Sequence, residues 1–104
     1  MQESIKKKIE EYKLELPQLI ELLVIDEWYA SKKLLGGLLS QLSDIMKELV
    51  IVSQTNVEVI EKCNELLQIY DVIMKTIQVE DSIQLIDLLQ YDVLSIFEQL
   101  KLHS

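Results

Sequence analysis

The apolar rhythm of one stretch constrains the fold of this chain more than any other feature. Between Lys33 and Val52, apolar residues recur at alternating steps of three and four, which is the spacing of one face of an α-helix. This face carries six residues, Leu35, Leu38, Leu42, Ile45, Leu49 and Val52. Four more apolar side chains widen it, at Leu34, Leu39, Met46 and Val50. A stripe this broad predicts a helix with two or three helical neighbours.

Length and composition favour a helical domain built around that stretch. The 104 residues include only two glycines and one proline, which leaves little material for turns. Leu, Ile, Val, Lys and Glu dominate, and this composition favours long helices over a sheet. A chain of this length is typical of one domain. We therefore predict a single all-α domain over residues 1–104.

The first predicted helix runs from about Glu3 to Val24. Its inward face holds Ile5, Ile9, Tyr12, Leu16, Leu19 or Ile20, and Leu23. Pro17 interrupts this helix, because a proline within a helix removes a hydrogen bond and clashes with the preceding turn, at a cost of about 3 kcal/mol. The apolar phase continues across Pro17, which favours a kinked helix over two separate helices.

The second predicted helix extends to about Val52, with Asp26 as its N-cap and Glu27 in its first turn. Gly36 and Gly37 fall inside it, and each costs close to 1 kcal/mol there. Helical phase turns Gly36 away from the Leu35–Leu42 side of the helix, toward Tyr29. Two interpretations remain open: a local bend or tolerated weakness, or the close approach of another backbone.

The third predicted helix covers about Asn56 to Gln78, after a turn at Ser53–Asn56. Thr55 with Glu58 matches a capping box, and Asn56 is an alternative cap. The predicted inward residues are Val57, Ile60, Cys63, Leu67, Tyr70, Met74 and Ile77.

The fourth predicted helix runs from Ser82 to about Lys101, with Asp81 as its cap. The predicted inward residues are Ile86, Leu89, Val93, Ile96, Phe97 and Leu100. Four helices with three short connections predict an antiparallel up-down-up-down four-helix bundle.

The charge pattern disfavours nucleic-acid and membrane partners. The formal net charge is −8, and every basic side chain is lysine. Arginine is the preferred residue for bidentate phosphate and base contacts, and acidity repels anionic membranes. The longest runs of Leu, Ile and Val have four residues, whereas a spanning helix needs roughly 20. The single cysteine and the charged first residues predict a protein of the reducing cytoplasm.

Residues with catalytic or metal-binding chemistry are sparse. The one histidine, His103, lies near the end of the chain, so no histidine-based catalytic or metal motif is predicted. Cys63 is predicted to pack in the core. Two acidic sets, Glu58, Glu61 and Glu65 and Asp81, Asp87 and Asp92, fall mostly on outer positions. We predict no enzyme activity, no catalytic or metal-binding residue and no cofactor.

Apolar residues on helix faces that are predicted to be exposed to solvent are the strongest functional signal in the sequence. Leu88, Tyr91 and Leu94 fall on the outer face of the fourth predicted helix. Tyr29 and Gly36 fall on the outer face of the second. A row of apolar residues along one helix is typical of a contact with another chain. We predict a partner surface at these five residues.

Two stretches resemble a known group of proteins. KLLGGLLSQLSDIM and SIQLIDLLQYDVLSIFEQL, the latter with the run Asp87–Tyr91, resemble uncharacterised small helical-bundle proteins of Gram-positive bacteria. The resemblance implies a bacterial helical bundle without an established activity.

Two functional hypotheses follow. The first is a non-enzymatic bundle that acts through protein–protein contact as a homodimer, an adaptor or a chaperone-like protein. The alternative is a bundle that binds a metal or ligand through carboxylates.

Overall fold

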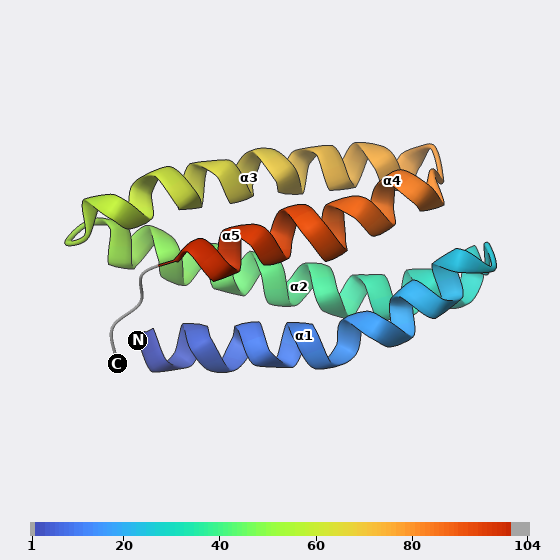
Figure 1. Ribbon diagram of the computed structural model, residues 1–104, viewed down its shortest axis with the longest axis horizontal. Coiled ribbons are helices and arrows are strands. Elements are labelled where there is room, and N and C mark those ends of the chain that lie inside the picture. The colour runs from blue at the N-terminus through green and yellow to red at the C-terminus, as the bar shows by residue number, and fades with distance from the viewer. Residues whose placement is uncertain (1, 101–104) are drawn as a thin grey trace.

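Four helical arms pack side by side in alternating directions in the computed structural model, which describes residues 2–100 (Figure 1). The arms are α1 (Gln2–Val24), α2 (Trp28–Ser53), α3 (Val57–Gln78) and a composite fourth arm. The fourth arm consists of α4 (Ser82–Asp87), the π-helical turn η1 (Leu88–Asp92) and α5 (Val93–Gln99). The all-α four-helix prediction is thereby confirmed. Within residues 2–100, every helix lacks an apolar segment of the length needed to cross a bilayer.

The helix α1 has the predicted core face. Its six buried apolar residues are Ile5, Ile9, Tyr12, Leu16, Leu19 and Leu23. Ile20, the alternative to Leu19, is only partly buried. The helix continues through Pro17 and bends in its second half (Figure 1). Proline is a common cause of such a bend, and the kinked-helix prediction is confirmed.

The helix α2 also has the predicted core face, but its start differs from the prediction. All six residues of the predicted stripe are buried, from Leu35 to Val52. Asp26 was expected to cap the helix, whereas Glu27 occupies the cap position without a side-chain hydrogen bond. The reason is the backbone of Asp26, whose φ of 57° places this residue in the turn. Trp28 packs at the margin of the core, partly buried.

The helix α3 begins as the alternative cap predicts, but its core face is rotated. The Asn56 side chain accepts a hydrogen bond from the Glu58 N–H, while the Thr55 hydroxyl donates to the preceding helix. The buried residues are Val59, Cys63, Leu66, Ile73 and Thr76. Of the predicted inward set, Val57, Ile60, Leu67 and Met74 are exposed, and only Cys63 is buried. The buried face of α3 lies between two apolar stripes of this helix, because α3 contacts both α2 and the fourth arm.

The fourth arm begins as predicted and is then interrupted by a π-helical turn. Asp81 caps α4 by accepting a hydrogen bond from the Gln84 N–H. In η1 the Val93 N–H bonds to the carbonyl of Leu88, five residues back, so the turn holds one extra residue. One residue corresponds to a rotation of ~100° about the helix axis. The face of α5 is therefore rotated relative to the face of α4.

Candidate interaction surface

The two α2 residues of the predicted partner surface are exposed. Tyr29 is 81% exposed, and the Lys33 Nζ lies 5.5 Å from the centre of its ring. A shallow cavity of about 300 Å³ between α1 and α2 borders it, lined by Gln18, Leu22, Tyr29, Ala30, Lys33 and Leu34. A Cβ atom at Gly36 would meet nothing within 4 Å. Within residues 2–100, the close backbone approach considered for Gly36 is therefore absent.

The predicted outer face of the fourth helix is not an exposed apolar row. Leu88 is buried, Leu94 packs partly buried against the core, and Tyr91 alone is strongly exposed, at 64%. Leu88 lies three positions after buried Leu85, which the predicted inward set left out, so the two residues share one helix face. The extra residue of the π-helical turn rotates Leu94 from the outer face to the flank of the core. It also turns Asp92 to the exterior, although its seven-residue spacing from buried Leu85 would place it inward in an uninterrupted helix.

A different apolar surface lies at one end of the bundle, where the α1–α2 turn and the α3–α4 turn meet (Figure 1, right). Four aliphatic side chains there are between 66% and 77% exposed: Val24, Ile25, Val79 and Ile83. We name these four residues the turn-end patch. Sequence periodicity does not predict this patch. It indicates which face of each helix is buried, but not which turns become neighbours in the fold. The available signal was the pair Ile25 and Val79, each a β-branched aliphatic residue placed directly before an acidic turn residue.

Both turns of this end have the same backbone geometry. The Asp26 N–H bonds to the Leu23 carbonyl at 3.1 Å, and the next N–H bonds to the Leu22 carbonyl at 2.9 Å. The equivalent bonds of the α3–α4 turn start from Glu80 and Asp81 and measure 3.1 and 3.3 Å. This is a Schellman motif, which usually has glycine in the left-handed position. Asp26 (φ 57°) and Glu80 (φ 52°) occupy that position here, at a cost of about 1 kcal/mol each.

Side-chain contacts join the two turns. The Ser82 hydroxyl donates a hydrogen bond to the Asp26 carboxylate. The Lys32 Nζ, from the first turns of α2, lies 3.2 Å from the Glu80 carboxylate. Each contact links one half of the bundle to the other, so the turn-end patch sits on two turns that are held together.

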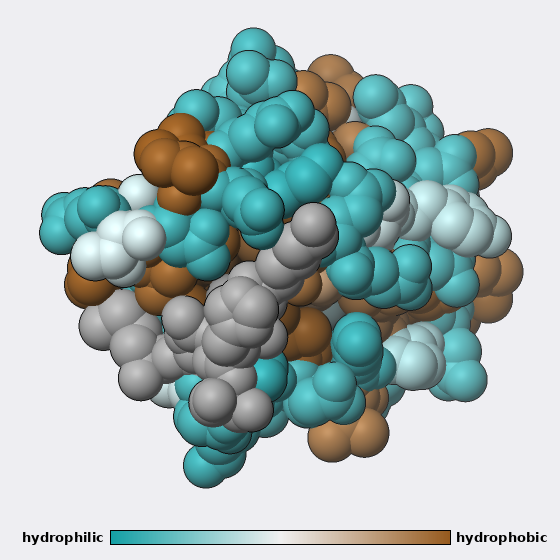
Figure 2. Space-filling view, turned by 60° about the vertical axis from the view of Figure 1, so that its left-hand side comes forward, coloured by the Kyte–Doolittle hydropathy of each residue, from teal (hydrophilic) through white to brown (hydrophobic). Residues whose placement is uncertain are grey.

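The turn end is acidic. Residues 24–32 and 78–83 contain four carboxylates, those of Asp26, Glu27, Glu80 and Asp81, and one lysine, Lys32. All four acidic residues are exposed. The opposite end, where α2 turns into α3, also carries exposed aliphatic side chains, at Ile51, Val57 and Ile60, and Figure 2 shows hydrophobic and hydrophilic areas side by side there.

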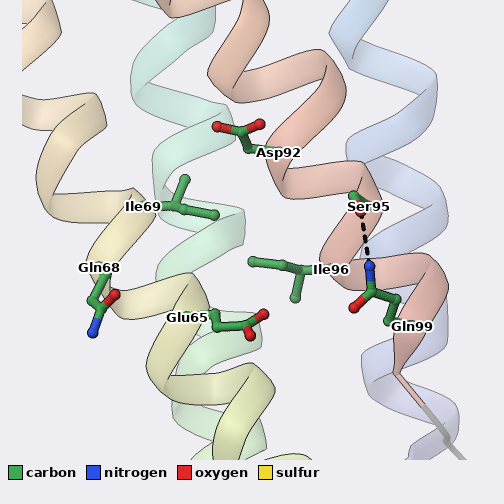
Figure 3. A pocket seen from close by; sticks show the side chains of 7 residues that line it. All are labelled: Glu65, Gln68, Ile69, Asp92, Ser95, Ile96 and Gln99. Atoms are coloured by element: carbon green, nitrogen blue, oxygen red, sulfur yellow. Dashed lines mark hydrogen bonds between the residues drawn. The ribbon is translucent and has the colours of Figure 1, made fainter.

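The groove between α3 and α5 has acidic rims but no metal-binding geometry. Its volume is about 270 Å³ (Figure 3). Glu65 and Asp92 lie at opposite ends of it, with Ile69 and Ile96 between them (Figure 3). The Lys62 Nζ pairs with Glu65 at 3.2 Å. In the part of the chain from 2 to 100, no group of three His, Cys, Asp or Glu side chains is gathered as a metal would require.

The two groups with clearly shifted pKa values belong to the core. Burial raises the pKa of the Tyr12 hydroxyl well above its ordinary value, and it also raises the pKa of the Cys63 thiol. The Tyr12 hydroxyl already donates a buried hydrogen bond of 2.8 Å to the Leu89 carbonyl. A thiol whose pKa is raised by apolar surroundings is a poor nucleophile. His103 lies outside the described residues.

Comparison of this chain with protein families, curated proteins and solved structures found no significant match.

Proposed function

We propose that this protein is non-enzymatic and acts through contact with another protein at the turn-end patch. The observation that carries the proposal is the gathering of four strongly exposed aliphatic side chains on two joined turns. A single exposed aliphatic residue needs no explanation. Several exposed aliphatic side chains on neighbouring turns can be covered together by a partner, which removes apolar area from water at ~25 cal/mol per Å².

The rigidity of the turn end supports this role. Both turns keep a non-glycine residue in the left-handed region, and local strain of this kind concentrates at functional sites. The paired backbone hydrogen bonds of each turn fix the backbone that carries Ile25 and Val79 before a partner arrives. A preorganised surface loses less conformational entropy on binding. An adaptor or a chaperone-like protein uses a surface of this type.

The charge and cysteine content support further parts of the proposal. A chain with a net charge of −8 and lysine as its only strongly basic residue is suited to protein partners rather than nucleic acid. The single cysteine, buried as a thiol, fits the reducing cytoplasm, where we propose that the protein acts.

The test is a comparative capture from native cells with a matched control. The wild-type chain, the double variant Ile25→Ser/Ile83→Ser and the control Leu14→Ser are tagged, and co-purifying proteins are quantified by mass spectrometry. Leu14 is a suitable control because it is 79% exposed on α1, away from the turns. We expect at least one protein to be captured equally by wild type and Leu14→Ser and to fall about tenfold or more with the double variant. Equal capture by all three proteins would contradict the proposal.

A further inference from the structure

The chemistry of the turn end identifies the kind of partner that fits it. We propose that the turn-end patch binds a short, basic, amphipathic segment of a different protein. This inference rests on the proposed function and adds the charge, the size and the origin of the partner.

The carboxylates around the patch favour a basic partner. Ile25 and Val79 directly precede Asp26 and Glu80, so each turn presents an aliphatic side chain beside an acidic one. Lys32 pairs with Glu80, whereas the Asp26 carboxylate accepts only the neutral Ser82 hydroxyl among the contacts of the described chain. A partner with aliphatic residues on one side and Lys or Arg beside them would match both the apolar centre and the acidic rim. Complementary rim charges mainly raise association rate and specificity.

The size of the end face favours a short segment. The bundle measures 42 × 22 × 18 Å, so the end face is bounded by its two shorter dimensions. A flat cross-section of these dimensions is smaller than the ~800 Å² of accessible surface that each partner buries in a standard stable interface. A short helical or extended segment covers such a surface, whereas a globular partner would need contacts elsewhere. Interfaces of this class are weak and transient.

Two copies of this chain do not complement each other at the same patch. A two-fold contact would bring the carboxylates of Asp26, Glu27, Glu80 and Asp81 against their own copies, with one lysine from each chain nearby. Like charges across an interface oppose association and suppress the wrong partner. The limited size of the end face adds to this repulsion, because a stable dimer buries ~800 Å² on each partner.

The experiment titrates the full-length ¹⁵N-labelled protein with three synthetic peptides and follows its backbone amide shifts. The peptides share one pattern of leucines and carry lysine, glutamine or glutamate at every polar position. We expect the lysine peptide to shift the amides of residues 24–29 and 79–84 with a Kd in the micromolar range. We expect the glutamate peptide to leave them unchanged. Raising the salt from 50 to 300 mM should weaken the lysine peptide several-fold, because salt screens exposed charges.

Two variants separate the apolar from the charged contribution. Ile25→Ser/Ile83→Ser should weaken the lysine peptide about tenfold. Glu27→Lys should weaken it several-fold, since this exposed side chain makes no capping hydrogen bond and its reversal leaves the turn intact. The matched control is Glu11→Lys, an equal charge reversal at an exposed position of α1, which should leave the Kd within a factor of two.

The outcomes distinguish this inference from the proposed function. Equal binding of all three peptides at the patch would overturn the charge argument while the patch remained a contact surface. Shifts confined to the α3–α5 groove, or no shifts from the lysine peptide, would overturn the inference. The proposed function would still be decided separately, by whether captured proteins depend on Ile25 and Ile83. Concentration-dependent dimerisation that Ile25→Ser/Ile83→Ser abolishes would identify a second copy as the occupant and would also overturn the inference.

Discussion

The Tyr12 hydroxyl joins the first helix to the last at the point where the last helix is irregular. In the π-helical turn the Val93 N–H bonds to the Leu88 carbonyl instead of the Leu89 carbonyl. The Tyr12 hydroxyl donates to that Leu89 carbonyl at 2.8 Å, across 77 positions of the sequence. The Tyr12 ring also meets the Phe97 ring edge-on, with centroids 5.5 Å apart. One side chain therefore satisfies the carbonyl at the π-helical turn and packs against the helix that follows it.

We expect Tyr12→Phe to destabilise the fold by about 1–3 kcal/mol, because a buried carbonyl loses its hydrogen-bond donor while the ring packing is kept. Urea unfolding followed by circular dichroism measures this change. Tyr91→Phe is the control, since Tyr91 is exposed and its hydroxyl remains in water in both states. An unchanged urea midpoint for Tyr12→Phe would show that the hydrogen bond contributes nothing to stability.

The raised pKa of Tyr12 makes the stability depend on pH under alkaline conditions. Unfolded tyrosine loses its proton near pH 10, whereas folded Tyr12 keeps it. The unfolded state therefore binds fewer protons above pH 10, so this contribution is complete below about pH 10 and declines above it, by up to ~1.4 kcal/mol per pH unit. Tyr12→Phe should show a shallower decline between pH 10 and 11 in urea titrations. Parallel declines would contradict the assignment, because all other titrating groups are shared.

At the scale of the elements, the π-helical turn decides which side chains at its end and after it belong to the core. Leu94 packs against the core, and Asp92 lies outside. An uninterrupted α-helix through Leu85 would bring Asp92 toward the core and turn Leu94 away from it. The turn thus adds an apolar side chain to the core and keeps a carboxylate in water.

We expect Leu88→Ala to cost about 2–3 kcal/mol, as truncation of a buried leucine does. Tyr91→Ala, three positions later on the exposed side, should change the stability by less than about 0.5 kcal/mol. Thermal unfolding of both variants tests the burial of Leu88. Equal effects would contradict its place in the core.

The left-handed residue of the α3–α4 turn offers a second test at this scale. Glu80→Gly should stabilise the fold by up to about 1 kcal/mol, because glycine adopts this backbone conformation without steric cost. The exposed ion pair with Lys32 that it removes contributes little. Glu80→Ala removes the same ion pair but keeps the backbone cost, so it should not stabilise. Equal stability of the two variants, measured by urea unfolding, would contradict the role of the backbone.

The sequence predicts the buried face of a helix correctly where a single apolar stripe dominates that helix. In α1 and α2 one stripe dominates, and all six predicted core residues of the Lys33–Val52 stretch are buried. In α3 the row Ile60, Leu67 and Met74 competes with the true core row, and only packing on both sides decides between them. The mark that the π-helical turn leaves on the periodicity is a single acidic residue, Asp92, at a position that an uninterrupted helix through Leu85 would turn inward. The turn-end patch depends on two turns 53 residues or more apart, which only the folded bundle brings together.

For the molecule as a whole, exposed aliphatic side chains lie at both ends of the bundle. The turn end combines four of them with four carboxylates, on two turns that side-chain contacts join. The far end has a single turn, between α2 and α3, with Ile51, Val57 and Ile60 exposed around it. The proposed function places the partner at the turn end, in line with the long axis of the molecule.

Site-specific photo-crosslinking in native cells tests this claim most directly. A photoreactive amino acid is placed at Ile83 in one strain and at the equally exposed Leu14 in another. After irradiation, we predict a discrete covalent adduct with a second protein from position 83 and no such adduct from position 14. Adducts from position 14 alone, or the same adducts from both positions, would contradict the turn end as the contact surface.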